Sequence, residues 1–209
     1  MNRLTTAKST LAAAALFCLS AAAQAMTVTY SAIGATDGSD ATGFSVAGTS
    51  VNGGDPNLLD IGVTPFSLDS ATASVMSDTL LVTITAAAGY YLETIQFSES
   101  GEYDASNGVA AATVQMLAGN VGPQPGGQVF FNNAGAWGPL SQTIDLTGMQ
   151  LTSVNVSISN QLFVGNAAIQ KTSAQLASTV APLPLPAAVW MLGTSLASLL
   201  VVTGRNRRA

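Results

Sequence analysis

The sequence contains no histidine, and its only cysteine is Cys18. Histidine is the commonest general base, a frequent metal ligand and a member of most catalytic triads, so its absence removes these mechanisms. Cys18 lies in an apolar stretch near the N-terminus, and removal of that stretch would leave a chain without thiols. We therefore expect no disulfide, no thiol catalysis and no cysteine metal site in the mature protein.

Positive charge is also scarce, with six Lys and Arg residues against eleven Asp and Glu residues in a chain of 209. Between residues 26 and 180 the only base is Lys171, and all eleven acids fall there, so this body carries a net charge of −10. Proteins that bind nucleic acid or anionic lipid surfaces need Lys and Arg to neutralise phosphates. The composition disfavours these partners and leaves divalent cations and neutral polymers such as polysaccharides.

The N-terminus has the three parts of a secretory signal peptide. Arg3 and Lys8 precede the uncharged run STLAAAALFCLSAAAQA, which ends in the small residues Ala23 and Ala25. A basic segment, a short apolar core and small residues at the break are typical of a leader that is cleaved, here after Ala25. The apolar core is short for an uncleaved anchor, which needs about 20 residues. We predict a signal peptide at residues 1–25 and export of the rest.

Residues 26–177 have the pattern of β-strands throughout. Runs such as MTVTYSAI, TLLVTITA and LTSVNVSISNQLFV alternate apolar and polar side chains. Asn-Gly, Asp-Gly and Gly-Gly pairs and several prolines separate the runs at spacings of roughly 8–12 residues. The pattern predicts one all-β domain, an antiparallel β-sandwich of jelly-roll-like type. Within this domain, alternation places Ile95 and Phe97 on one face of a strand and Leu92 on the other.

The C-terminal tail has the composition of a membrane anchor. Residues 187–204 carry no charge, and as a helix they would span roughly 27 Å, close to the thickness of a hydrocarbon core. The basic tip at residues 205–209 then lies in the cytoplasm and the body outside, by the positive-inside rule. Prolines before the apolar run predict an extended hinge at residues 178–186. The basic residues of the tip are Arg205, Arg207 and Arg208.

Two other interpretations of the tail are a plain anchor without processing and a helix packed on the body. The run is apolar on every side, which disfavours the packed helix. The stretch APLPLPAAVWMLGTSLASLLVVTGRNRRA resembles the VPLPA-CTERM variant of the PEP-CTERM sorting signals, in which a short motif precedes a transmembrane helix and an Arg-rich tip. It differs in having Leu183 where Val often stands and in the Asn206 that interrupts the tip. The motif residues are Pro184, Leu185, Pro186, Ala187, Ala188 and Trp190.

This resemblance implies recognition by an exosortase, a membrane cysteine protease-transpeptidase of Gram-negative bacteria. The exosortase would process the chain near the motif and release it or transfer it to the cell surface. The protein would thus be anchored only transiently in the inner membrane, with its body in the periplasm. Bacteria with this system often make exopolysaccharide, and many such substrates look like components of the extracellular matrix of biofilms. Exopolysaccharide is therefore a candidate partner.

Three residues of the body are candidates for catalysis. Glu99 and Glu102, in the run SESGEYD, could form a glycosidase-like pair if their carboxyl groups lay about 5–10 Å apart. Lys171 could act as a base, although a solvated or edge-strand lysine is the more common case. Alternation around Gly101 predicts instead a strand that runs into a turn. We therefore assign no catalytic residue.

Two further groups of residues are candidates for ligand binding. Trp137 lies in the stretch NNAGAWGP, where an exposed ring could stack on a sugar and a buried ring could fill the core. Paired loop carboxylates could bind Ca²⁺, but they follow no EF-hand spacing, and turn-forming residues are the commoner explanation. We assign no metal site and no cofactor. The carboxylates considered are Asp37, Asp40, Asp55, Asp60, Glu102 and Asp104.

These features predict a noncatalytic, exported β-sandwich that a C-terminal sorting signal delivers to the cell surface or the extracellular matrix. Two other classes stay open for the body, a glycan-active hydrolase and a calcium-dependent or carbohydrate-binding adhesion module. A carboxylate pair in a cleft would favour the hydrolase, and grouped loop oxygens would favour calcium. A flat exposed face with Trp137 turned outward would favour sugar binding.

Overall fold

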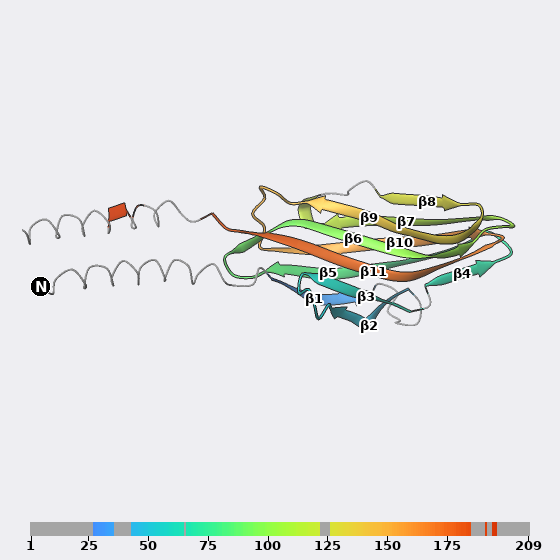
Figure 1. Ribbon diagram of the computed structural model, residues 1–209, viewed down its shortest axis with the longest axis horizontal. Helices are drawn as coiled ribbons and strands as arrows, with labels where there is room; N and C mark the ends of the chain where they lie inside the picture. The colour runs from blue at the N-terminus through green and yellow to red at the C-terminus, as the bar shows by residue number, and fades with distance from the viewer. Residues whose placement is uncertain are drawn as a thin grey trace, which may run out of the picture.

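The part of the chain that the computed structural model describes comprises residues 27–35, 43–64, 66–121 and 126–184, together with Met191, Thr194 and Ser195. These residues form an antiparallel β-sandwich of two sheets, which confirms the predicted all-β architecture (Figure 1). The signal peptide predicted at residues 1–25 lies outside the described residues, as does nearly all of the predicted span. No helix among the described residues is long and apolar enough to cross a membrane.

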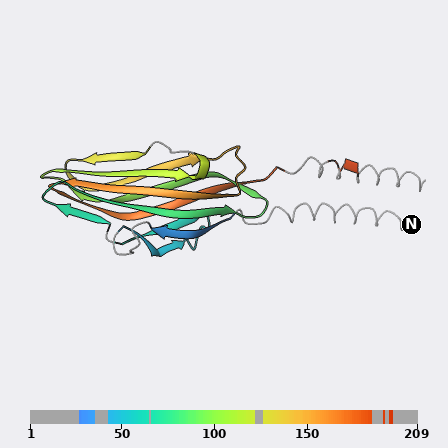
Figure 2. The ribbon, with the colours of Figure 1, turned by 180° about the vertical axis from the view of Figure 1, so that it is seen from behind.

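The two sheets are called sheet A and sheet B. Sheet A has the order β1-β5-β10-β7-β8, with β1 (Val28–Ala35), β5 (Ser74–Ala86), β10 (Ser153–Gly165), β7 (Val109–Ala118) and β8 (Gly127–Phe131). Sheet B has the order β2-β3-β11-β6-β9, with β2 (Gly43–Val51), β3 (Leu58–Thr64), β11 (Ala167–Pro182), β6 (Tyr90–Asp104) and β9 (Ala134–Asp145), and β4 (Ser67–Ser70) also pairs with β11. A 3-10 turn at Gly119–Val121 follows β7. Figure 1 shows the outer side of sheet B, and Figure 2 shows that of sheet A.

Strand β10 illustrates how the sequence forms the core. Apolar side chains occupy nearly every second position and point inward, while the residues between them face outward. The strand pairs with β5 on one side and with β7 on the other, so it lies inside sheet A. Burial of each large apolar side chain contributes roughly 1.5–3 kcal/mol. The buried apolar residues of β10 are Val154, Val156, Ile158, Leu162 and Val164.

Strand β6 departs from strict alternation at one point. Leu92 is as fully buried as Ile95 and Phe97, although the sequence pattern places it on the opposite face. Thr94 and Leu92 are two residues apart on β6, but their partners on β11 are consecutive residues, so the register of the two strands shifts here. The extra residue of β6 forms a β-bulge, which exchanges the two faces of the strand beyond it. The expectation for Leu92 is therefore wrong.

Both ends of the sandwich are fastened to the turn between β5 and β6. The N–H of Ala87 donates to the carbonyl oxygen of Thr27 (2.9 Å), just before β1. The carbonyl oxygen of Gly89 accepts a hydrogen bond from the N–H of Leu183 (2.8 Å), just after β11. As a result, β1 begins and β11 ends at the same end of the sandwich (Figures 1 and 2).

The last strand is longer than the sequence analysis predicts. Strand β11 continues to Pro182, which pairs with Tyr90 of β6. Its alternation persists past the predicted boundary at residue 177, because Val180 still packs into the core. Residues 178–182 therefore belong to sheet B, and only the remainder of the predicted hinge at 178–186 lies beyond the strand.

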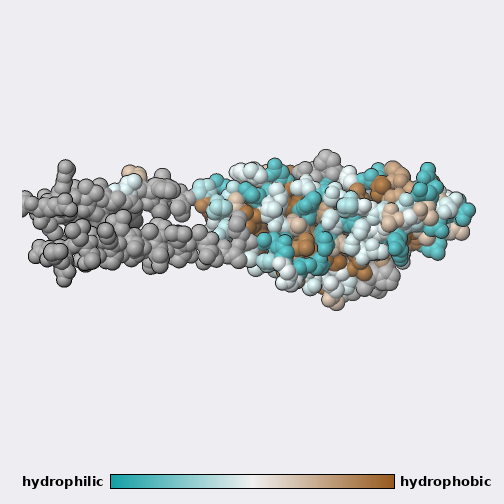
Figure 3. All heavy atoms as spheres, in the orientation of Figure 1, coloured by the Kyte–Doolittle hydropathy of each residue, from teal (hydrophilic) through white to brown (hydrophobic). Residues whose placement is uncertain are grey.

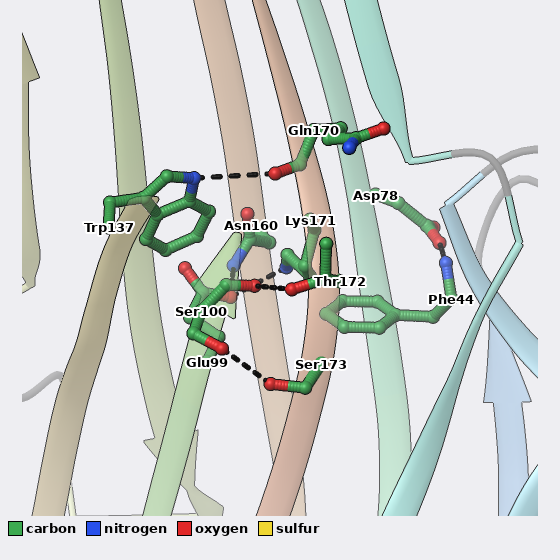
Figure 4. A network of polar contacts seen from close by, with 10 residues as sticks. All are labelled: Phe44, Asp78, Glu99, Ser100, Trp137, Asn160, Gln170, Lys171, Thr172 and Ser173. Atoms are coloured by element: carbon green, nitrogen blue, oxygen red, sulfur yellow. Dashed lines mark hydrogen bonds and ion pairs between the residues drawn. The ribbon is translucent and has the colours of Figure 1, made fainter. Parts of the chain in front are cut away.

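Trp137 of β9 fills the core beside Gly101 of β6. The tryptophan is 4% exposed, and its Nε1 donates a hydrogen bond to the carbonyl oxygen of Gln170 (3.3 Å; Figure 4). Gly101 is its register partner, and a Cβ at this glycine would lie 2.5 Å from Trp137 Nε1. Only glycine leaves room for the indole at this point. The structure thus contradicts the alternative in which Trp137 is exposed and stacks on a sugar.

We expect Gly101→Ala to lower the free energy of unfolding by about 2–4 kcal/mol, because the added methyl group must displace the indole or the neighbouring backbone. Urea unfolding followed by circular dichroism measures this change. Gly53→Ala is the matched control, since a Cβ there meets no atom within 4 Å. Its effect should stay within about 0.5 kcal/mol. Equal stability of Gly101→Ala and the original chain would contradict this packing.

Candidate functional site

Charge is distributed unequally between the two sheets. The strands of sheet A contain a single charged residue, Asp78, and it is buried. The outer side of sheet A is therefore uncharged over its described strands, and we call it the neutral face (Figure 2). Figure 3 shows the opposite side, where hydrophilic residues are spread over sheet B. The charged residues in the strands of sheet B are Asp60, Asp69, Glu93, Glu99, Glu102, Asp104, Asp145 and Lys171.

A row of apolar side chains crosses the neutral face. Val75, Phe163, Ala111 and Phe130 are register partners on β5, β10, β7 and β8, and we call them the aromatic row. Phe130 is 71% exposed and Val75 is 54% exposed, whereas Ala111 is covered. Val75 lies near the start of β5, while the turn that is hydrogen-bonded to both ends of the sandwich follows the end of this strand. The aromatic row thus lies at the end of the domain that is far from this turn.

A polar row runs beside the aromatic row on the same face. Ser77, Gln161, Thr113 and Gln128 are register partners on the same four strands, two residues along, and they line a shallow hollow. Farther along the face, hydroxyl groups pair across strands, as Thr79 does with Ser159 at 2.9 Å. Within the described part of the chain, the side chains of the polar row make no such pairs. Their hydroxyl and amide groups can both donate and accept hydrogen bonds to a ligand.

A second polar group, the buried cluster, lies between the sheets and consists of Lys171, Glu99 and Asn160 (Figure 4). Lys171 of β11 forms an ion pair with Glu99 of β6, with Nζ 2.6 Å from Oε2. Asn160 of β10 donates a hydrogen bond from Nδ2 to the same oxygen, so the cluster joins sheet B to sheet A. The exposed fractions of Glu99, Asn160 and Lys171 are 1%, 2% and 5%. The cluster is closed to solvent.

Three phenylalanine rings surround the amine of Lys171. Its Nζ lies 4.3 Å from the ring centre of Phe66, 4.6 Å from that of Phe44 and 6.0 Å from that of Phe97. Burial lowers the pKa of Lys171 to about 8, against the opposing effect of Glu99. Burial also raises the pKa of Glu99 above its ordinary value, although Lys171 acts in the opposite direction. Burial thus opposes the charge of both groups, while their mutual attraction maintains it.

The structure separates the two carboxylates considered for a hydrolase. Glu99 points into the core, whereas Glu102 is exposed on sheet B and accepts a hydrogen bond from Gln170 Nε2 (2.8 Å). The expected solvated or edge-strand position of Lys171 is wrong, because β11 lies inside sheet B and the side chain is buried. Sequence analysis missed Asn160, although it occupies an inward position in the alternation of β10 and could have been recognised there.

The carboxylates considered for Ca²⁺ are engaged locally where the structure describes them. Asp55 and Asp104 each accept a hydrogen bond from the backbone N–H two residues on, as turn residues do. Asp60 accepts hydrogen bonds from two side-chain amides. Within the described residues, no three His, Cys, Asp or Glu residues gather where they could hold a metal ion. Asp37 and Asp40 lie outside the described part of the chain.

The predicted sorting and cleavage sites lie almost entirely outside the described residues. Pro184, the first residue of the motif, is described and exposed just beyond β11. The roles of the other residues stay predictions from the sequence. They are Ala23, Ala25, Leu185, Pro186, Ala187, Ala188, Trp190, Arg205, Arg207 and Arg208.

We expect Glu99→Gln to lower the free energy of unfolding by about 3–5 kcal/mol, because it removes the charge partner of a buried lysine. Glu102→Gln makes the same chemical change three residues along β6, on the exposed side, and should alter stability by less than about 0.5 kcal/mol. Urea unfolding of the two variants at neutral pH tests this difference. Similar effects of the two changes would show that the ion pair is unimportant for folding.

Comparison with known proteins gives distant structural likenesses. No protein-family model matches the sequence, and no curated protein matches it. A solved structure of TmCBM61 in complex with β-1,4-galactotriose is 14% identical, with 68% of this chain and 86% of that chain covered and a TM-score of 0.26. A structure described as CBM4 is 12% identical, with 52% and 86% covered and a TM-score of 0.22. A family two carbohydrate esterase from Cellvibrio japonicus is 11% identical, with 76% and 37% covered and a TM-score of 0.23.

Proposed function

We propose that the chain is a noncatalytic adhesion module of the cell surface or extracellular matrix, and that it binds a neutral polysaccharide through the neutral face. The observation that carries this proposal is the combination of the aromatic row with the polar row on the uncharged outer face of sheet A. This function corresponds to the carbohydrate-binding alternative for the body. The aromatic row takes the stacking role that the sequence suggested for Trp137.

The charge pattern supports a neutral ligand. The body has a net charge of −10, yet the strands behind the neutral face contain only the buried Asp78. An anionic polymer would be repelled by the domain as a whole and would find no base on this face. A neutral polymer incurs neither cost. The charges that keep the protein soluble lie instead on sheet B and in the loops, where they would not obstruct binding.

The chemistry of the two rows suits a sugar. Sugar rings present C–H groups on their faces and hydroxyl groups around their edges. Phe130, at 71% exposed, offers a ring on which such a face can stack, with Phe163 beside Ala111 in the same row. The polar row lies roughly 7 Å from the aromatic row, because side chains on one face of a strand recur every two residues. Its amides and hydroxyls can donate and accept hydrogen bonds to the sugar hydroxyls. A polysaccharide lying across the strands would contact both rows.

Delivery to the surface is the second part of the proposal. The signal peptide at residues 1–25 would export the chain, and the tail would anchor it transiently in the inner membrane of a Gram-negative bacterium, with the body in the periplasm. An exosortase-type protease would then act near the motif that begins at Pro184. The position of both domain ends at one turn supports this arrangement, because the aromatic row then faces away from the anchor.

Binding to a panel of soluble polysaccharides in affinity gels tests the ligand. We expect a neutral glycan to retard the protein and Phe130→Ala to weaken that binding about tenfold, since loss of a stacking ring costs about 1.4 kcal/mol. Met149→Ala is the control, because Met149 is equally apolar and 49% exposed but lies in the turn after β9. Unchanged binding by Phe130→Ala would contradict the proposal. So would a Phe130-dependent dimer in sedimentation, which would make the neutral face a contact between copies.

Mass spectrometry of the mature protein tests delivery. In cells that contain the sorting protease, we expect the N-terminus to begin after Ala25 and the C-terminus to end near the motif. In cells without the protease, the chain should keep its tail. An intact C-terminus at Ala209 in both would contradict sorting and leave a plain membrane anchor.

A further inference from the structure

We propose that Lys171 and Asn160 become joined by an amide bond in the core of the sandwich, with release of ammonia. The bond would link Nζ of Lys171 to Cγ of Asn160 and would fasten β11 of sheet B to β10 of sheet A. Glu99 would promote its formation. This inference rests on the buried cluster and is independent of the proposed function, which concerns the outer face of the protein.

The geometry brings the reacting groups together. Lys171 Nζ and Asn160 Nδ2 both contact Oε2 of Glu99, so hydrogen-bond lengths alone place the two nitrogens within about 6 Å of each other. The three side chains come from three different strands and meet at one point between the sheets (Figure 4). Groups held in such positions react as if at very high concentration, because no encounter is needed.

The surroundings shift both groups toward the protonation states that the reaction needs. Attack on an amide requires an amine with a free lone pair, and a lysine in an apolar pocket loses its proton more readily. Phe44, Phe66 and Phe97 supply that pocket around Nζ and help to exclude water. The lowered pKa of Lys171 and the raised pKa of Glu99 point the same way, toward a neutral amine and a protonated carboxyl group. Exclusion of water also protects the intermediate from hydrolysis.

Two buried oxygens of the cluster lack hydrogen bonds within the described residues, and the reaction gives both a role. They are Oε1 of Glu99 and Oδ1 of Asn160. Buried polar atoms are normally paired, so these two require an explanation. Rotation of the Asn160 amide by half a turn exchanges Nδ2 and Oδ1, after which a protonated Glu99 can donate a hydrogen bond to Oδ1. That bond polarises the carbonyl group and stabilises the charge that develops on its oxygen during attack.

The atoms and charges of the reaction balance without another reactant. The lone pair of Lys171 Nζ attacks Cγ of Asn160, and the N–C bond forms as the carbonyl becomes tetrahedral. A proton passes from Nζ to the carboxyl group of Glu99, and the tetrahedral centre turns back about its bond to Cβ, which returns Nδ2 to Glu99. Nδ2 then takes the proton, the Cγ–Nδ2 bond breaks, and ammonia leaves. The carboxyl group ends in its starting protonation state. No atom is oxidised or reduced, and the product is a neutral amide in place of an amine and a primary amide.

The product suits its position better than the separate groups do. A buried ion pair requires strong compensation for the lost hydration of its charges. The new amide carries no charge, and its N–H and carbonyl oxygen can both bond to the carboxyl group of Glu99. The bond also closes a short covalent loop through the turn between β10 and β11, which keeps the two sheets in contact at this point.

The chain offers a direct test, because Lys171 is the only site for trypsin between residues 26 and 180. We expect the purified exported protein to weigh about 17 Da less than its sequence requires, which corresponds to one ammonia. Trypsin should fail to cut the denatured protein after Lys171, and a mass spectrum of another digest should contain a peptide that joins β10 to β11. Glu99→Gln should show the full mass.

Lys171→Arg is the control, because an arginine keeps the trypsin site but does not form the bond. It should have its full calculated mass and be cut after residue 171 when denatured. Complete cleavage of the original protein after Lys171, together with full mass, would overturn the proposal. A deficit of about 17 Da that persists in Lys171→Arg would also overturn it, because the ammonia would then come from another residue.

Discussion

The contact of Lys171 with Glu99, an ion pair before the proposed amide bond forms, is the interaction on which the interior of the sandwich depends. It places the only base of the body against a carboxylate between two sheets that are otherwise packed mainly by apolar side chains. Because buried charges are costly unless they are paired, the strands that carry them must keep their register. Asn160 adds a contact from the opposite sheet. The cluster therefore fixes β6 and β11 relative to each other and both relative to β10.

The same division between inside and outside governs the surface. Sheet A keeps its one charge in the core and presents amides, hydroxyls and phenylalanines outward, whereas sheet B carries most of the exposed acids. A neutral sheet on an acidic body combines solubility with a surface that can lose its water to a partner. In the proposed function, the neutral face contacts the polymer and the acids of sheet B remain in water.

The sequence predicts the architecture well because alternation with a period of two is a local property of each strand. It predicts the face of Leu92 wrongly because the bulge in β6 depends on pairing with β11, which is distant in sequence. The aromatic row is hidden for a similar reason, since Val75, Phe163, Ala111 and Phe130 become neighbours only through register. The buried cluster could be predicted only in part. The alternation of β10 places Asn160 inward, but its partners could not be identified without the pairing of the strands.

The position of β11 has a mechanical consequence. This strand lies inside sheet B, between β3 and β4 on one side and β6 on the other, and the chain leaves the domain from its C-terminal end. Hydrogen bonds between antiparallel strands run perpendicular to the strands. Tension on the tail would therefore pull along β11 and load its many hydrogen bonds together in shear. An edge strand pulled sideways would instead open one hydrogen bond at a time. If the chain is held at the cell surface through its tail, as proposed above, this arrangement resists the force.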